Sequence, residues 1–190
     1  DRLRNAVASG RRAVELSKQP IRPRDILTRP AFENAITVLM ALGGSTNAII
    51  HLLALARRAG ITLDLQDFNH FSNSVPLLVN CKPTGTYTLE NLHQAGGLPV
   101  LLKALESHMD LSTRGVTGKT LGELIANQSP PATWQRVIHT LDKPLGSTGS
   151  LVILKGSLAP QGAVIKAASA TPSLLHHRGP AVVFESPEDA

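Results

Sequence analysis

Apolar residues recur every three or four positions through the first two thirds of the chain, the spacing of helices that bury one face. Leu3, Val7 and Val14 predict a first helix, which Gly10 weakens and the segment Pro20 to Pro23 ends. A second helix is predicted to begin at Pro30, because proline suits the first helical position. It would bury Phe32, Ile36, Leu39 and Met40.

Gly43 and Gly44 end that helix, and a third begins almost at once. Three good N-cap residues stand there, Ser45, Thr46 and Asn47, and Gly60 is a natural stop. The apolar residues between them at helical spacing are Ile49, Leu52, Leu53 and Ala56. Asp64 could cap a short helix that carries Leu65, Phe68 and Phe71.

The middle of the chain mixes element types. Residues 75–79 predict a buried strand that leads into a turn at 82–85. Thr88 and Pro99 each open a further helix, with Gly96 and Gly97 between them. Residues 120–123 have the form of a capping box.

The pattern changes after Ile125. Residues 126–135 are polar and contain prolines, and beyond them short apolar runs separated by glycine predict strands at 151–154, 163–165 and 181–184. Residues 156–166 predict a hairpin with a proline–glycine turn. We therefore expect two domains, residues 1–130 and 131–190, meeting between about 127 and 148 with Pro130–Pro131 as the linker.

Charge and composition narrow the class of protein. The net charge of +5 comes entirely from residues 1–29, which hold eight basic and three acidic side chains. That segment has no aromatic residue for base stacking, and aromatic residues make up only 3% of the chain. These features favour a solvated helix face over nucleic-acid binding.

No apolar run approaches the roughly 20 residues needed to span a bilayer, and residues 1–9 form a charged amphipathic stretch rather than a secretory signal. We expect a soluble, cytoplasmic protein without a membrane partner. The single cysteine, Cys81, could be exposed after the predicted strand, but no activating partner stands near it. One thiolate cannot hold a cluster, and the histidines have no zinc-type spacing, so we expect no metal ligand.

The sharpest local feature is the segment 43–47, Gly-Gly-Ser-Thr-Asn, between two helices. Two glycines allow close backbone approach, and a helix N-terminus favours an anion, so Gly44, Ser45, Thr46 and Asn47 are candidate substrate-binding residues. The alternative is a tight turn with a strong cap. His51, one turn after Asn47, could share its face, or could be a hydrogen-bonded structural histidine.

Several segments occur in the order seen in one enzyme family. They are ALGGSTNAIIHLLALARRAGI at 41–61, VPLL and KPTGTY within 75–87, AGGLP at 95–99, TGKTL at 117–121, LKGSLAPQGAVIK at 154–166 and HRGPAVVFESPEDA at 177–190. From about Ile21 onward the chain resembles the dihydroxy-acid/phosphogluconate dehydratase family. Ser157 departs from the family, in which asparagine is common at that position.

The resemblance implies a hydro-lyase that converts a 2,3-dihydroxy acid or a sugar acid to a 2-keto acid. In the family a base removes the proton beside the carboxylate, an iron–sulphur cluster acts on the leaving hydroxyl and magnesium holds the substrate. The family's cluster cysteines, magnesium carboxylates and modified lysine precede the equivalent of Asp1, and its serine base follows Ala190. The resemblance therefore implies no catalytic residue, cluster or magnesium on this chain itself.

By resemblance the fold is α/β: the helical end of an α/β amino-terminal domain, followed by the start of a β-barrel-like carboxy-terminal domain. Residues 21–47 look closer to the sugar-acid branch than to the amino-acid-biosynthesis branch. The small-molecule partner would be a hydroxy acid, and the whole enzyme would be a homo-oligomer. The alternative is a non-catalytic binding or scaffold module, which the lack of cysteines and carboxylate clusters favours.

Overall fold

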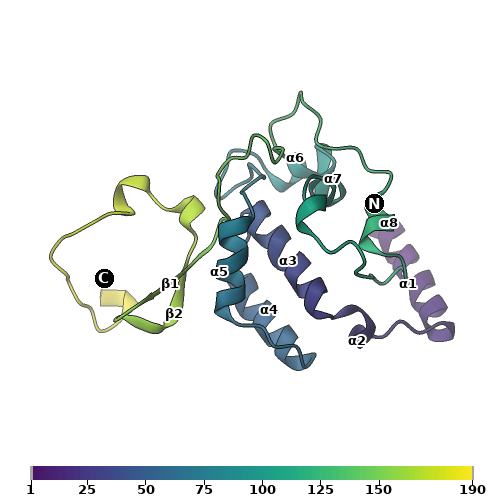
Figure 1. Ribbon diagram of the computed structural model, residues 1–190, viewed down its shortest axis with the longest axis horizontal. Helices are drawn as coiled ribbons and strands as arrows, with labels where there is room; N and C mark the ends of the chain where they lie inside the picture. The colour runs from purple at the N-terminus through teal and green to yellow at the C-terminus, as the bar shows by residue number, and fades with distance from the viewer. Residues whose placement is uncertain (1, 190) are drawn as a thin grey trace.

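A computed structural model describes residues 2–189, which form a helical body followed by a small antiparallel sheet (Figure 1). The helices come first in the chain and the two strands follow. The longer elements are α1 (Arg2–Lys18), α3 (Arg29–Leu42), α4 (Asn47–Arg58), α5 (Leu65–Ser74), α7 (Gly97–Ala104), β1 (Val152–Gly156) and β2 (Ala159–Ile165). The shorter ones are α2 (Pro23–Ile26), α6 (Leu89–Gln94), η1 (Glu106–His108), α8 (Leu121–Ile125), η2 (Ala167–Ser169), η3 (Pro172–Leu174) and η4 (Pro187–Asp189).

The core surrounds α3, whose Ile36 and Met40 are fully buried. Phe68 of α5 and Leu101 of α7 pack into the same cluster, as do residues from the segment 75–79. Thr28 caps α3, since its hydroxyl accepts from the Ala31 amide at 3.4 Å. The apolar pattern thus placed the buried face of α3 correctly.

The predicted helices are present, with small differences at their ends. Asp64 caps α5, Thr88 caps α6 and Thr120 caps α8, each in a capping box. α7 begins at Gly97, two residues before the predicted Pro99. α1 ends at Lys18 and residues 20–22 are non-helical, as the prolines predicted, and the short α2 begins at Pro23.

The strand predicted at 75–79 is wrong, although the segment is extended and buried. Leu77 bridges Gly146 and Val79 bridges Ile138, so the segment pairs singly with two separate stretches of chain. The amides of Leu78 and Val79 both donate to the Ala41 carbonyl at the end of α3. Each pairing is a single bridge, so residues 75–79 do not form a continuous ladder with either partner.

The predicted hairpin is present, but its turn lies elsewhere. β1 and β2 pair antiparallel, with Val152 opposite Ile165 and Gly156 opposite Ala159, so the turn falls at 157–158. Pro160 and Gly162, expected in the turn, lie within β2. The register is irregular between Leu154 and Gly156.

The strand predicted at 181–184 is also wrong. Within residues 2–189 this segment pairs with no strand, and Val183 is 90% exposed. Two strands make a mixed helix-and-sheet protein, consistent with the α/β class. They do not by themselves form the start of a barrel.

Residues 137–151 pack against the helical body rather than leaving it. The Asn80 amide donates to the Val137 carbonyl at 2.8 Å, and the Gly149 amide donates to the Ser72 carbonyl at 2.7 Å. Leu151 is fully buried in the same core as α3. Figure 1 shows the chain extending away from the helices only beyond this point.

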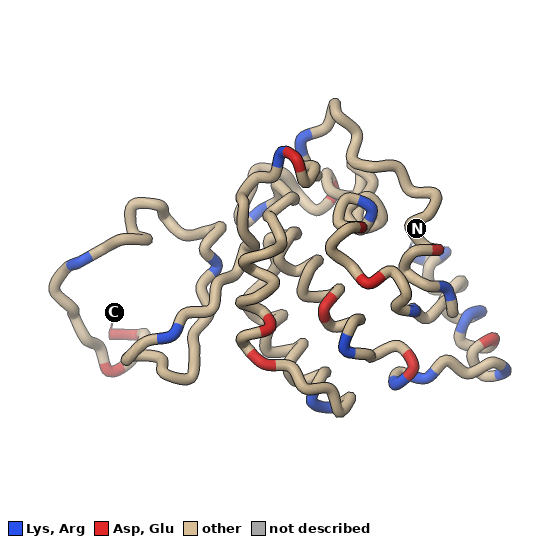
Figure 2. The backbone as a smooth tube through the Cα atoms, viewed as in Figure 1, with Lys and Arg blue, Asp and Glu red and all other residues tan. Residues whose placement is uncertain are grey.

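α1 lies at the edge of the helical body and has no buried residue. Its main polar contact is from Arg12, whose guanidinium donates to the Val116 carbonyl at 2.7 Å. Figure 2 shows basic residues along α1 and the turns that follow it, the segment that carries the net charge. No helix within residues 2–189 has the length and apolar character needed to cross a bilayer.

Candidate functional site

The loop between α3 and α4 is built on two glycines. Gly43 ends α3 with a positive φ of 76°, a conformation that suits glycine, and the amides of Gly43 and Gly44 both donate to the Leu39 carbonyl. A Cβ on Gly44 would lie 2.2 Å from Leu39 Cδ1, a side chain held in the core. The loop therefore lies tightly against the end of α3.

The first amides of α4 already have partners. The Asn47 amide donates to Ser45 Oγ at 3.2 Å, the Ala48 amide to the Ser45 carbonyl at 3.0 Å and the Ile49 amide to the Thr46 carbonyl at 3.2 Å. Ser45 is thus the capping side chain, while Thr46 makes no capping hydrogen bond. The free amides expected to face an anion are instead used inside the protein.

The loop nevertheless presents polar side chains outward. Ser45 and Asn47 are exposed, and Thr46 is half-buried. His51 follows Asn47 by one turn of α4, and it is exposed as well. A ligand at this loop would meet hydroxyl and amide groups, which suit the hydroxyls and carboxylate of a hydroxy acid.

Two distant segments meet this loop, and the sequence reasoning did not place either there. Lys166, just after β2, donates from Nζ to the Gly43 carbonyl at 2.7 Å. Thr84 of the 82–85 turn lies beside Gly43, and its Oγ1 is 3.1 Å from the hydroxyl of Ser169. Both segments belong to the ordered motifs of the sequence, KPTGTY and LKGSLAPQGAVIK, which were the only available signal.

Lys166 carries the charge nearest to the Gly43 carbonyl. Burial lowers the pKa of its half-buried ammonium. No carboxylate within residues 2–189 lies within 4.0 Å of the Lys166 ammonium. The ion pairs among these residues are Arg12–Glu15, Arg29–Glu33, Arg29–Asp67 and Lys103–Glu106. A carbonyl, not a carboxylate, is the partner of this cation.

The 82–85 turn is fixed by Asn80. A Cβ on Gly85 would lie 2.3 Å from Asn80 Oδ1, which accepts from the Thr86 amide at 2.8 Å. The glycine is therefore required for the turn to fold back on residue 80. This close approach holds Thr84 next to Gly43.

Cys81 is buried, with 5% of its surface exposed, so the possible exposure of this thiol is not observed. Its Sγ donates to the Thr88 carbonyl at 3.4 Å, and burial raises its pKa. In the part of the chain that the structure describes, no three His, Cys, Asp or Glu side chains are grouped as metal ligands. The residues present do not fit an iron–sulphur cluster or a magnesium site.

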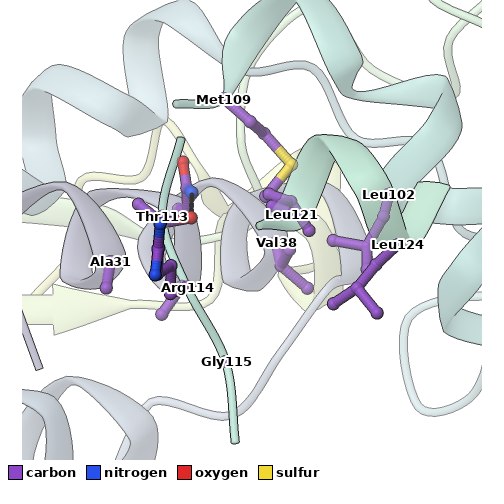
Figure 3. Close-up of a pocket in the computed structure, with 11 residues that line it drawn as sticks. Ala31, Val38, Leu102, Met109, Thr113, Arg114, Gly115, Leu121 and Leu124 are labelled. Carbon is purple, nitrogen blue, oxygen red and sulfur yellow. Dashed lines mark hydrogen bonds between the residues drawn. The ribbon is translucent and has the colours of Figure 1, made fainter. Parts of the chain in front are cut away.

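A cavity of about 230 Å³ lies between α3, α7 and α8 (Figure 3), and its lining includes no residue of the 43–47 loop. Val38, Leu102 and Leu124 give it an apolar wall. Its buried Asn34 is already bonded to the backbone of Asp110 and to the Thr113 hydroxyl. Arg114 is the charged residue of a lining that is otherwise mostly apolar, so this cavity offers few polar groups to a hydroxy acid.

Comparisons with known proteins assign the class. The chain is 50% identical to a dihydroxy-acid dehydratase from Nocardioides sp. over 191 residues, which cover 97% of this chain and 33% of that protein. The dihydroxy-acid dehydratases of Acidothermus cellulolyticus and Sulfurisphaera tokodaii are 48% and 46% identical, each over 100% of this chain and 34% of theirs. These relatives are hydro-lyases, and the chain spans about a third of their length.

Two family models match the chain. The dihydroxy-acid/6-phosphogluconate dehydratase N-terminal model matches residues 1–124, and the C-terminal model matches residues 136–190. The chain belongs to the dihydroxy-acid/6-phosphogluconate dehydratase family. The resemblance seen in the sequence is confirmed, although the names of these relatives give no support to the sugar-acid branch.

Proposed function

We propose that this chain is part of a hydro-lyase that converts a 2,3-dihydroxy acid to a 2-keto acid. The identity of 50% to the Nocardioides dehydratase over nearly the whole chain carries the proposal. The dihydroxy acid is preferred to a sugar acid because the relatives compared all bear the dihydroxy-acid name. A non-catalytic scaffold is disfavoured by the same match.

In this proposal, Gly44, Ser45, Thr46 and Asn47 contact the substrate. Exposed hydroxyl and amide groups next to a half-buried ammonium support that role. Because the first amides of α4 are engaged, Ser45, Thr46 and Asn47 would contact the substrate through their side chains, and Gly44 through its carbonyl. The chemistry of proton removal and hydroxyl departure belongs to groups outside this chain.

We place the iron–sulphur cluster and magnesium of the enzyme on those other segments. There magnesium would supply a cation for substrate oxygens, and the cluster would supply a Lewis acid. The buried single thiol of Cys81 supports their location elsewhere. The isolated chain would then be inactive.

We further propose that residues 1–130 end an α/β domain and residues 131–190 begin a β-barrel-like one. α8 ends at Ile125, and β1 and β2 follow. An isolated pair of strands is marginal in water, so further strands from the rest of the enzyme would complete this sheet.

The exposed apolar side chains support a homo-oligomer. The reduced free thiol of Cys81 is compatible with a cytoplasmic enzyme.

A hybrid enzyme tests the function. The matching third of the Nocardioides dehydratase would be replaced by this chain, and 2-keto acid formation would be measured with a dihydroxy acid and with an aldonic acid. We expect dehydration of the dihydroxy acid within about tenfold of the parent rate, which is ~1.4 kcal/mol in barrier height. A folded, metal-loaded hybrid that forms no 2-keto acid would contradict the proposal.

A further inference from the structure

Lys166 and Gly43 are 123 residues apart, yet a direct hydrogen bond of 2.7 Å joins them. Gly43 ends α3, where the carbonyl groups of the last turn point out of the helix without intrahelical partners. A cation there is favoured by the negative end of the helix dipole. The ammonium at this position comes from the strand hairpin and not from α3 itself.

The bond is well placed to hold the loop. Gly43 immediately precedes the candidate substrate residues, so fixing its carbonyl fixes the start of the segment 44–47. On its other side the loop is held by Leu39, whose carbonyl accepts from both glycine amides. Lys166 supplies the restraint that Leu39 cannot, because it joins the loop to β2.

A second contact joins the same segments. Thr84 Oγ1 and Ser169 Oγ lie 3.1 Å apart, and Thr84 is next to Gly43. Residues 166 and 169 therefore contact the loop and the turn beside it. Within residues 2–189 Lys166 has no carboxylate neighbour that would explain its position by ion pairing.

We infer that Lys166 is a positioning residue that holds the 43–47 loop in its substrate-binding conformation through the Gly43 carbonyl. The inference rests on the proposed function, because it assigns a role in that same site. Lys166 acts through Gly43 and is not itself assigned to the reacting atoms. The ligand of the 43–47 loop is the one proposed above, a hydroxy acid whose oxygens contact the loop.

The test uses the hybrid enzyme with K166M, which keeps the apolar stem of the side chain and removes the ammonium. Amide hydrogen exchange in the segment 44–47 should become faster by about tenfold or more, as expected for the loss of a hydrogen bond to a charged group. The KM for the dihydroxy acid should rise by a similar factor while kcat changes little. K166R should partly return both the exchange rate and KM to the values of the unsubstituted hybrid, since a guanidinium can also donate to a carbonyl.

The matched control is K155M, because Lys155 lies on β1 of the same hairpin and its side chain is exposed. This variant should leave exchange at 44–47 and KM unchanged. Unchanged exchange at 44–47 in K166M would overturn the inference, whether or not the hybrid is active. Faster exchange with an unchanged KM would support the tie to the loop but remove the loop from the substrate site, which counts against the proposed function.

If K166M fails to fold, a measurement on the unsubstituted protein still tests whether the Lys166 ammonium is held by the Gly43 carbonyl. Nitrogen-15 spectra of the lysine ammonium groups should show Lys166 protons that exchange with water more slowly than those of Lys155. Equal exchange rates for the two lysines would overturn the inference.

Discussion

The hydroxyls of Ser45 and Thr46 are adjacent in sequence but have different surroundings. Ser45 Oγ accepts the Asn47 amide and so stabilises the start of α4. The Thr46 hydroxyl has no capping role and is half-buried at the surface of the loop. A change at Thr46 therefore tests substrate binding without loss of the cap, whereas a change at Ser45 removes the cap as well.

Replacing Thr46 with valine keeps the shape and removes the hydroxyl. In the hybrid enzyme we expect T46V to raise KM or lower kcat by about tenfold, the effect of ~1.4 kcal/mol in transition-state binding. The melting temperature should stay nearly constant, because no capping bond is lost. Steady-state kinetics and a thermal melt on the same preparation measure both quantities.

The matched control is S45A, which removes the capping oxygen. It should lower the stability of the protein by about 0.5–2 kcal/mol, the usual cost of losing a cap. If T46V leaves the kinetics intact and lowers the melting temperature, the segment is only a structural turn. That was the alternative interpretation of this sequence.

Local signals were sufficient to find the residues of the loop, but not their neighbours. Paired glycines followed by small polar residues mark Gly44 to Asn47 without any knowledge of the fold. Lys166 meets the loop only because β2 returns to α3, a contact across 123 residues. The local sequence left open whether Cys81 is exposed, because its burial in the core involves residues distant in sequence.

At the scale of elements, α3 and α5 are joined by an ion-pair network at their N-terminal ends. Arg29 pairs with Glu33 on its own helix and with Asp67 on α5, and it also donates to the Thr62 carbonyl. Burial alone would raise the pKa of Asp67, but the hydrogen bonds from Arg29 and from the Asp64 amide outweigh it and lower that pKa. The pair is therefore favourable in the folded state.

We expect R29M to lower the free energy of unfolding by about 1 kcal/mol at pH 7, near the upper end for partly exposed pairs. Because the Asp67 pKa is lowered on folding, its contribution is present above the ordinary aspartate pKa of about 4 and is lost as pH falls through the folded-state value. The difference between R29M and the unsubstituted chain should therefore narrow below pH 4. Urea unfolding at several pH values measures it.

K103M is a suitable comparison, since among residues 2–189 the one ion-pair partner of Lys103 is Glu106, one turn away on the neighbouring segment. This change should cost about 0.5 kcal/mol or less. A constant difference between R29M and the unsubstituted chain from pH 7 to pH 2 would show that the guanidinium acts through packing and not through Asp67.

Helices were predicted better than strands because their signals are local. Thr88, Asp64 and Thr120 mark helix starts by their own side chains, and each was observed to cap. A strand exists only when a partner lies beside it. Residues 75–79 contact two separate segments, and residues 181–184 contact no strand among those described, so an apolar run was not enough.

The hairpin turn was misplaced for a related reason. Pro160 and Gly162 are common in turns, but a proline is also tolerated at the start of an edge strand. β2 contains both residues, and the observed turn lies earlier, at 157–158, just after the irregular register between Leu154 and Gly156. Register depends on pairing across the sheet, which composition does not report.

At the scale of the whole molecule, large apolar side chains are exposed on many elements, among them α1, the hairpin and the last segment. α1 exposes Leu3, Val7 and Val14, the hairpin exposes Leu158, and the last segment exposes Val183. Scattered apolar residues are ordinary on a protein surface, but several on one helix face form an apolar patch that promotes association. In the proposed enzyme, surfaces of this kind would be covered by its other segments or by a second copy of the enzyme.

We therefore expect the 190-residue chain on its own to self-associate, with an average mass by sedimentation that rises with concentration. The double substitution L158S and V183S should reduce this association, because both side chains are almost fully exposed, at 101% and 90%. For the same reason it should change the free energy of unfolding by no more than about 0.5 kcal/mol. A matched pair at polar exposed positions, S157A and E185A, should leave the association unchanged. A chain that sediments as a monomer at every concentration would show that these side chains are tolerated in water, and the apolar surface would then give no support to the proposed homo-oligomer.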